Sequence, residues 1–414
     1  DGGNDLSGTI RISGSKNASL PIMTASLLTD EELVLNNVPN LSDVITMQEL
    51  LFSLGTTISF NKNIEVLRLR TKNSDSFTAD YEIVRKMRAS IIVLGPTLVK
   101  RRIAKVALPG GCSIGSRPID LHLKGLEAMG ASIYIDNGYV FAEAKQGLKG
   151  TTIKFPFASV GATQNIILAA TLASGTTTIS NAACEPEIVD LCECLRKMGA
   201  KIVGDGTKVL SIMGVANLSG ATHTVMADRI ELGTFMLAPA IAGGEILLEG
   251  FGLDKVNNFT EKLEHMGLHF CKKENAIRVV SQNSKLKAID IATNPFPGFP
   301  TDLQPQLMAA LGLAEGTSTI LENVFENRFM HAPELNRMGA NIVINGQNAC
   351  ISGVSEYRGV PVMASDLRAA ASLVLAGLGA KGKTIIDGLH HLDRGYQNIE
   401  KKLAQCGVNI YRAD

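Results

Sequence analysis

The chain has 414 residues, of which 45% are hydrophobic and 19% are charged. This composition excludes a disordered protein, and the length favours two domains over a single core. Lysine and arginine together number 40, as do aspartate and glutamate, so no overall field draws the protein to nucleic acid or to anionic lipid. We therefore expect no nucleic-acid partner, and any phosphate site must be local.

The apolar runs of the chain are too short to cross a membrane. One of the longest, residues 369–380, falls well below the roughly 20 residues that a bilayer requires. No signal peptide is recognised in the sequence. We therefore expect no membrane insertion and a cytoplasmic location.

The seven cysteines contain no CxxC pair and show no Cys/His metal-ligand spacing. Disulfides and structural zinc are therefore not expected. Six of the cysteines lie among apolar residues or in helix-like segments, where a free cysteine usually acts as a small buried hydrophobe. Cys112 is the exception, because it lies in the glycine-rich stretch LPGGCSIGSRPID at 108–120.

Six copies of one pattern follow each other along the chain. Each copy contains a strand rich in β-formers, a turn, and a helix that ends in glycine. The two clearest copies are residues 172–202 and 313–342, and looser copies occupy 27–58, 241–270 and 378–410. The Cys112 stretch belongs to the sixth copy and is followed there by LHLKGLEAMGASI. The glycines that end the six helices recur about every seventy residues and are expected to be left-handed C-caps: Gly55, Gly130, Gly199, Gly267, Gly339 and Gly407.

Helices of small residues lie between these copies, for example at 159–175 and 365–380. Small side chains allow close packing, so we expect these helices to lie inside, with sheets around them. Six units then divide most simply into two domains of three. Six unrelated α/β segments remain the alternative interpretation of the pattern.

Several motifs in this frame carry a resemblance to a known family. In chain order they are GSKNASLP at 14–21, VRKMRASI at 84–91, PGGCSIGSRPIDLH at 109–122, SVGAT at 159–163, EPEIVD at 185–190, FPTDLQ at 299–304, ENRFMH at 326–331, SDLRA at 365–369 and DRGY at 393–396. With them, the chain closely resembles the enolpyruvyl transferases over nearly its whole length. The resemblance implies an α/β fold of two inside-out α/β barrel domains, each of three pseudo-symmetric repeats. It places the first domain at 14–225, with the Cys112 loop, and a discontinuous second domain at 1–13 and 226–414.

Within this family, the chain is most similar to the members that act on UDP-N-acetylglucosamine. The resemblance implies that the enolpyruvyl group of phosphoenolpyruvate is transferred to the 3-hydroxyl of this sugar, with release of phosphate by addition and elimination. This reaction is the first committed step of peptidoglycan synthesis. No metal or redox cofactor is implied, because proton transfer and electrostatic stabilisation cover the reaction. We expect a monomer whose small-molecule partners are these two substrates.

Two residues carry the expected acid and base chemistry. Taken alone, Cys112 is more often an incidental loop thiol, whereas the resemblance implies a reactive cysteine that donates the proton. Asp302 precedes an apolar run and taken alone is more often a helix cap. The resemblance implies that it is the general base for the sugar hydroxyl.

A cationic set is expected around phosphoenolpyruvate, which carries a phosphate and a carboxylate. Any one of these side chains, taken alone, is more often a solvated charge or an ion-pair partner. Lys16 and Arg394 are also expected to take part in catalysis. The set implied by the resemblance is Lys16, Arg117, Arg328, Arg368 and Arg394.

A second set is expected to bind the sugar nucleotide. Its members implied by the resemblance are Asn17, Arg88, Arg117, Pro118, Ile119, Asp120, Leu121, Ser159, Val160, Gly161, Asp302 and Val324. Backbone N–H groups at the start of a helix favour a diphosphate, although Ser159 is equally consistent with an ordinary N-cap. The family often has a lysine two residues before Ser159, where this chain has Phe157.

Two other functions remain open at this point. The shikimate-pathway enolpyruvyl transferase shares the fold and the use of phosphoenolpyruvate, but it needs no nucleotide pocket. A non-catalytic paralogue could bind a UDP-sugar without turnover, although all the acid, base and cationic positions are filled here.

Overall fold

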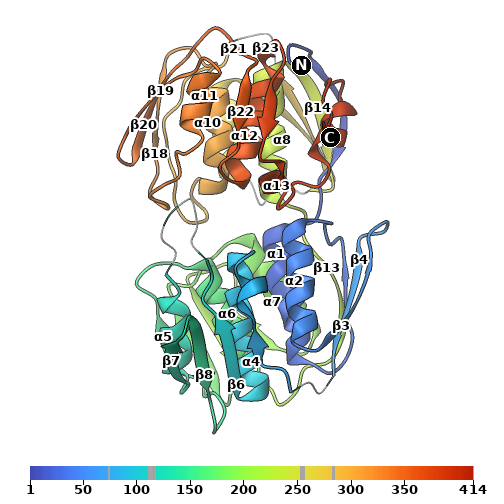
Figure 1. Ribbon diagram of the computed structural model, residues 1–414, viewed down its shortest axis with the longest axis vertical. Helices are drawn as coiled ribbons and strands as arrows, with labels where there is room; N and C mark the ends of the chain where they lie inside the picture. The colour runs from blue at the N-terminus through green and yellow to red at the C-terminus, as the bar shows by residue number, and fades with distance from the viewer. Residues whose placement is uncertain (73–74, 111–114, 116–117, 252–256, 282–284, 414) are drawn as a thin grey trace. The chain divides into compact units, whose positions relative to one another are not determined.

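The computed structural model describes residues 1–72, 75–110, 115, 118–251, 257–281 and 285–413. The described residues divide into two compact units (Figure 1). The first unit contains residues 14–110 and 118–226, and the second contains residues 1–13 and 227–413. Each unit has a hydrophobic core of its own.

The first unit contains three four-stranded sheets that share one topology. In each sheet two parallel strands are followed by an antiparallel pair, and hydrogen bonds between the described strands join no two of the sheets. The orders are β13-β2-β4-β3, β5-β6-β8-β7 and β9-β10-β12-β11. The strands are β2 (Leu33–Asn36), β3 (Thr56–Asn61), β4 (Val66–Thr71), β5 (Thr78–Ala79), β6 (Ile103–Ala107), β7 (Ser132–Asp136), β8 (Tyr139–Glu143), β9 (Thr152–Lys154), β10 (Thr176–Ser180), β11 (Lys201–Val203), β12 (Val209–Met213) and β13 (Ala221–Thr224).

Three helices form the interior of this unit, and each of them precedes the second strand of one of these sheets in the chain. They are α1 (Lys16–Thr24), α4 (Leu94–Arg101) and α6 (Val160–Ala170), and α6 is buried from Ala162 onward. Small residues permit this packing: a Cβ added to Gly95 would lie 2.4 Å from Asn165 Oδ1. The remaining helices are α2 (Ser42–Ser53), α3 (Tyr81–Val84), α5 (Asp120–Ala128) and α7 (Pro186–Lys197), with 3₁₀ turns η1 (Ala25–Leu28) and η2 (Arg88–Val93).

The second unit repeats this architecture around α8 (Arg229–Ala242), α10 (Gln304–Leu311) and α12 (Leu367–Leu378), which are largely buried. Two sheets have the same four-stranded topology, and the third region contains two parallel pairs, β21-β23 and β22-β24. The strands are β1 (Leu6–Arg11), β14 (Gly244–Glu249), β15 (Leu268–Lys273), β16 (Ala276–Ser281), β17 (Ile291–Ala292), β18 (Thr317–Leu321), β19 (Asn341–Asn345), β20 (Asn348–Ser352), β21 (Tyr357–Arg358), β22 (Pro361–Met363), β23 (Ala380–Lys381) and β24 (Ile385–Asp387). The other helices are α9 (Asn257–Met266), α11 (Ala332–Arg337), α13 (Leu389–Leu392) and α14 (Ile399–Ala404), with the 3₁₀ turn η4 (Thr301–Leu303).

One sheet in each unit is completed by a strand from a distant part of the chain. β1 pairs in parallel with β14 in the second unit, and β13 pairs in parallel with β2 in the first. A buried ion pair holds the end of β1, because Lys402 donates to Glu231 Oε1 at 2.6 Å and Ser13 N donates to Glu231 Oε2 at 2.6 Å. The second unit is therefore discontinuous in sequence.

The six glycines at the ends of the repeated helices all have positive φ, between +90° and +107°. The cap at Gly199 shows the reason. Gly199 N donates to Arg196 O, and Ala200 N donates to Leu195 O, both at 2.9 Å. This closes the last turn with a residue in a conformation that glycine adopts without strain. The repeat pattern predicted from the sequence is confirmed.

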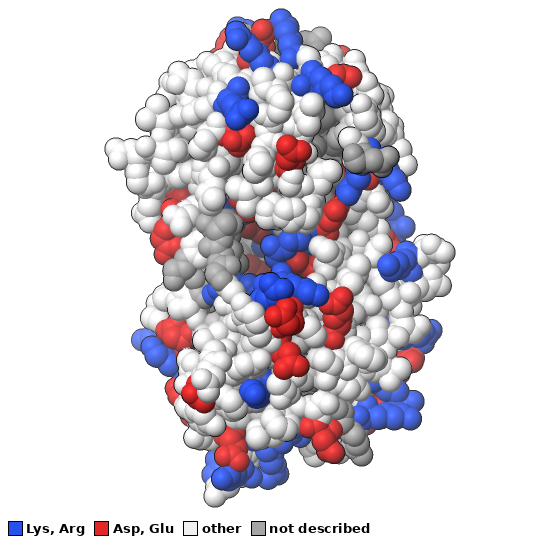
Figure 2. Space-filling view, in the orientation of Figure 1, with Lys and Arg blue, Asp and Glu red and all other residues white. Residues whose placement is uncertain are grey.

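The surface carries both signs of charge over the two units, as the equal numbers of acidic and basic residues lead one to expect (Figure 2). Among the described helices, none combines the length and apolar character that a membrane crossing needs.

Candidate active site

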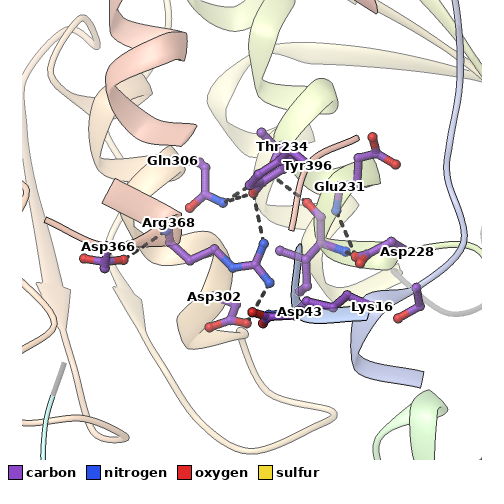
Figure 3. Close-up of polar contacts among 12 residues, drawn as sticks. Lys16, Asp43, Asp228, Glu231, Thr234, Asp302, Gln306, Asp366, Arg368 and Tyr396 are labelled. Atoms are coloured by element: carbon purple, nitrogen blue, oxygen red, sulfur yellow. Dashed lines mark hydrogen bonds and ion pairs between the residues drawn. The ribbon is translucent and has the colours of Figure 1, made fainter. Parts of the chain in front are cut away.

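Asp302 lies between two arginines in the second unit, and Figure 3 shows it with one of them, Arg368. Arg328 Nη2 donates to Asp302 Oδ1 at 2.8 Å, and Arg368 Nη2 donates to Asp302 Oδ2 at 3.0 Å. The arginine side chains are 3% and 4% exposed, whereas that of Asp302 is 28% exposed. The structure therefore brings three of the predicted residues together and leaves the carboxylate accessible.

Asp302 does not cap a helix. It lies inside η4, whose N-cap is Pro300, and neither η4 nor α10 has a side-chain cap. The capping interpretation, which the sequence alone favoured, is wrong because the carboxylate is engaged by the two guanidinium groups. Burial by itself would lower the pKa of Arg368, but the charge of Asp302 raises it above its ordinary value.

A buried carboxylate that the sequence analysis missed supports this region. Glu322, at the end of β18, is fully buried. Its Oε1 accepts from Thr293 Oγ1 and from the backbone N–H of Val324 and Phe325, and its Oε2 accepts from Thr301 Oγ1 at 3.0 Å. Glu322 thus links the turn that contains Val324 to the residue before Asp302. No local pattern reveals this role, because two of the partners, Thr293 and Thr301, lie 29 and 21 residues from Glu322 in the sequence.

Arg394 follows α13 and is partly buried. Burial is the largest cause that lowers the pKa of the neighbouring His391, and the charges of His390 and Arg394 act in the same direction. The structure thus places Arg394 beside His391.

In the first unit, Lys16 opens α1 and pairs with a buried acid. Its Nζ donates to Asp43 Oδ2 at 3.2 Å, and the two side chains are 12% and 5% exposed. Ser15 caps the helix by accepting from Ala18 N. Asn17 is partly buried on the same helix.

The residues predicted to bind the nucleotide form a second group in this unit, centred on His122. Asn165 Oδ1 accepts from Gly95 N, so its Nδ2 donates to His122 Nδ1 at 3.0 Å. The neutral imidazole then carries its proton on Nε2. That nitrogen lies 3.2 Å from where a Cβ on Gly161 would be. The start of α5 and the start of α6 are therefore adjacent.

The surroundings of His122 include two of the predicted residues, Arg88 and Asp120. Burial is the largest cause that lowers the pKa of His122 to about 4, and the charge of Arg88 lowers it further against the opposing effect of Asp120. Arg88 Nη1 donates to Gly110 O at 3.2 Å. Asp120 forms an ion pair with Lys124 at 3.4 Å. His122 is thus a neutral hydrogen-bonding group near neutral pH.

Ser159 caps α6 by accepting from Ala162 N at 3.4 Å, so the ordinary N-cap interpretation holds. Val160 and Gly161 follow in the first turn, and Phe157 is 58% exposed just before it. Leu121 is buried, whereas Pro118 is exposed and Ile119 is partly buried. Two predicted residues, Cys112 and Arg117, lie outside the described residues.

The comparisons with known proteins agree on one family. The model of the family described as EPSP synthase (3-phosphoshikimate 1-carboxyvinyltransferase) matches residues 1–403. The chain belongs to this carboxyvinyltransferase family. The family predicted from the sequence motifs is thereby confirmed.

Relatives within the carboxyvinyltransferase family are similar over their whole length. The UDP-N-acetylglucosamine 1-carboxyvinyltransferase of Dinoroseobacter shibae is 56% identical, covering 99% of this chain and 97% of the relative. The enzyme of the same name from Cereibacter sphaeroides is 56% identical over 99% of this chain and 98% of the relative. That of Gluconobacter oxydans is 53% identical over 99% of this chain and 98% of the relative.

Two solved structures share the fold of this carboxyvinyltransferase family. The enolpyruvyl transferase NikO from Streptomyces tendae has a TM-score of 0.89 at 24% identity, covering 98% of this chain and 96% of that chain. An EPSP synthase from Acinetobacter baumannii has a TM-score of 0.76 at 21% identity, covering 98% and 97%. The predicted α/β fold class is therefore confirmed.

The pKa of His122 leads to a testable prediction on stability. An unfolded histidine has a pKa near 6.5, so between about pH 6.5 and pH 4 the unfolded chain binds a proton that the folded chain does not. Folding stability is therefore complete above about pH 6.5 and falls as the pH drops, by about 3 kcal/mol from this residue. Urea unfolding at pH 7 and pH 4.5 should show a smaller loss in His122→Gln than in the parent. An equal loss in both proteins would contradict the burial of a neutral imidazole.

Proposed function

We propose that this chain transfers the enolpyruvyl group of phosphoenolpyruvate to the 3-hydroxyl of UDP-N-acetylglucosamine, releasing phosphate, as the first committed step of peptidoglycan synthesis. The observation that carries the proposal is the accessible Asp302 carboxylate held by two buried arginines, in a chain 56% identical to relatives that bear this activity's name. An ionised carboxylate with both oxygens oriented is suited to accept a hydroxyl proton.

The reaction proceeds in two steps. In the addition, Asp302 takes the proton of the sugar 3-hydroxyl, and the hydroxyl oxygen bonds to the carbon of phosphoenolpyruvate that carries the phosphate. Cys112 gives its proton to the neighbouring methylene carbon. This forms a tetrahedral phospho-ketal. In the elimination, the Cys112 thiolate takes back a proton from the new methyl group and the C–O bond to phosphate breaks, which restores the double bond and releases phosphate.

The cations divide into two groups in this proposal. Arg328 and Arg368 are almost fully buried and already engaged with Asp302, so they act mainly by orienting the base. Lys16, Arg117 and Arg394 then hold the phosphate and carboxylate of phosphoenolpyruvate. Lys16 is suited to this task because Asp43 fixes its ammonium group while 12% of the side chain stays exposed.

The nucleotide binds, in this proposal, where α5 and α6 begin. The first turn of α6 offers backbone N–H groups to the diphosphate, which the helix dipole favours. Neutral His122 presents its Nε2 side to this turn at Gly161. Arg88 and residues 117–121 contact the uridine end, and Asn17 and Val324 face the sugar.

Phe157 is expected to limit the affinity for the nucleotide. It is 58% exposed two residues before the cap of α6, where the family often has lysine. Phe157→Lys should lower the KM for UDP-N-acetylglucosamine about fivefold with little change in kcat, because a charge-assisted hydrogen bond to phosphate is gained. Steady-state kinetics at two salt concentrations would check this, with Phe157→Gln as the uncharged control. A KM that falls equally in both variants would contradict the role of the charge.

The two competing functions are less consistent with these findings. The similarity to the EPSP synthase structure, at 21% identity, supports only the fold, whereas the relatives at 53–56% identity act on the sugar nucleotide by name. A binding paralogue without turnover would not need Asp302 to remain accessible between two arginines. We further propose that the two compact units correspond to the domains at 14–225 and at 1–13 with 226–414, and that the protein is a cytoplasmic monomer.

Phosphate release distinguishes these functions. The protein is incubated with phosphoenolpyruvate and either UDP-N-acetylglucosamine or shikimate 3-phosphate, and inorganic phosphate is measured. We expect release with the sugar nucleotide. Release with shikimate 3-phosphate alone would reverse the assignment, and no release with either would favour the binding paralogue.

A further inference from the structure

Tyr396 lies next to Arg368 in the core of the second unit, on the side of the guanidinium group away from Asp302 (Figure 3). It is 1% exposed, and its hydroxyl has three hydrogen-bonding partners from three different helices. Arg368 Nη1 of α12 donates to it at 3.2 Å, Gln306 Nε2 of α10 donates at 3.0 Å, and Thr234 Oγ1 of α8 lies 2.9 Å away. The sequence analysis assigned no role to Tyr396, Gln306 or Thr234.

The directions of these hydrogen bonds are fixed by the chemistry of the groups. A guanidinium group and the NH₂ of an amide only donate, so the Tyr396 oxygen accepts from Arg368 and from Gln306. Thr234 Oγ1 donates its own proton to Ile230 O at 2.8 Å and accepts from Gln306 Nε2 at 3.1 Å. The Tyr396 proton therefore goes to Thr234. Both lone pairs of the tyrosine oxygen are thus committed, one of them to Arg368.

This arrangement determines where the other end of the guanidinium points. The group is planar and rigid, so fixing Nη1 on Tyr396 also sets the direction of Nη2, which donates to Asp302 Oδ2 at 3.0 Å. The Arg368 Cζ atom lies 5.5 Å from the centre of the Tyr396 ring, which adds a cation–π contact. Tyr396 is therefore connected to the candidate base through a single side chain.

We propose that Tyr396 is a positioning residue: its hydroxyl, oriented by Thr234 and Gln306, aims Arg368 at Asp302 and so sets the orientation and basicity of the carboxylate that takes the sugar proton. This inference rests on the proposed function, in which Asp302 is the base. Arg328 holds the other carboxylate oxygen, so loss of the Tyr396 contact weakens one half of the clamp and leaves the other intact.

The test is Tyr396→Phe, which keeps the ring and removes only the oxygen. Arg368 loses its buried acceptor and its hold on Asp302, so we expect kcat to fall about tenfold, with a smaller change in either KM. Because a cation near a carboxylate lowers its pKa, the acid limb of the kcat/KM profile should move to higher pH, by about half a unit to one unit. A merely structural role would not move this limb.

Tyr357→Phe is the matched control. Tyr357 is also fully buried in the second unit, but its hydroxyl donates to Ala309 O at 2.7 Å. It should lose stability as Tyr396→Phe does, while keeping the parent kcat and pH profile. If the parent is active and Tyr396→Phe has the same kcat and the same acid limb as the parent, the inference is overturned. If the parent itself shows no turnover, the proposed function is overturned instead. If Tyr396→Phe does not fold, Thr234→Val decides: a shifted acid limb supports the inference and an unshifted one overturns it.

Discussion

Replacing Asp302 by asparagine should lower kcat by about 10²–10⁴-fold. The amide keeps the shape of the side chain but cannot accept the proton of the sugar hydroxyl. Its NH₂ would also face one of the two guanidinium groups, which lie 2.8 and 3.0 Å from the carboxylate oxygens. The loss should therefore appear mainly in kcat, as measured by phosphate release with saturating substrates.

The same substitution should also destabilise the second unit. It leaves Arg328 and Arg368, which are 3% and 4% exposed, without their shared anion. Removing one partner of a buried ion pair typically costs about 3–5 kcal/mol, so activity must be measured where circular dichroism shows the variant folded. Asp290→Asn is a suitable control. This aspartate of the same unit is exposed, and its Oδ1 accepts a hydrogen bond from the backbone N–H of Thr319 at 2.7 Å. A folded Asp302→Asn enzyme with parental turnover would exclude Asp302 as the base.

The repeat architecture could be predicted from the sequence because its signals are local. Glycine adopts positive φ without strain and therefore often follows the last turn of a helix, so the six glycines after helix-like segments predicted six helix ends. The buried helices, such as α6, were likewise indicated by runs of small and apolar residues. The placement of β1 in the second unit has no local signal and came only from the family resemblance.

The candidate site was predictable only in part, because its contacts join distant positions. Asp302 and Arg368 are 66 residues apart, and Thr234 and Tyr396 are 162 apart. No periodicity connects such pairs, so the residues alone favoured a helix cap at Asp302. The motifs identified Asp302 and the arginines, but Glu322, Gln306 and Thr234 emerged only once the chain was folded.

The burial of the cysteines could be predicted only in part from their neighbours in the sequence. Cys192, Cys194 and Cys406 are buried as predicted, and burial raises the pKa of Cys194 to about 12. Cys271 and Cys350 are exposed, contrary to the prediction. They lie on β15 and β20, where alternate residues point to opposite faces of the sheet and these two face outward. Apolar neighbours in a strand therefore do not imply burial.

Replacing Cys112 by serine should lower kcat by about 10²–10⁴-fold, with little change in stability. A thiol has a pKa near 8.5 and gives up its proton readily. A serine hydroxyl is a far weaker acid and cannot supply a proton to the methylene carbon. Phosphate release by the two proteins, compared at equal concentration, gives the measurement. Parental turnover in Cys112→Ser would assign the proton donor to another group.

The thiol also predicts selective alkylation. An epoxide analogue of phosphoenolpyruvate, fosfomycin, should be opened by the Cys112 thiolate: the C–S bond forms, one C–O bond of the ring breaks, and the released oxygen takes a proton. Bound UDP-N-acetylglucosamine should accelerate the reaction by ordering the site. Peptide mass spectrometry can locate the adduct, and the exposed Cys271 and Cys350 provide internal controls within the same protein. A modified Cys112 with both controls unmodified is the expected result, because general thiol reactivity would label exposed cysteines as well. Equal labelling of the three cysteines, or an unmodified Cys112, would remove the reason for treating this thiol as part of the reaction.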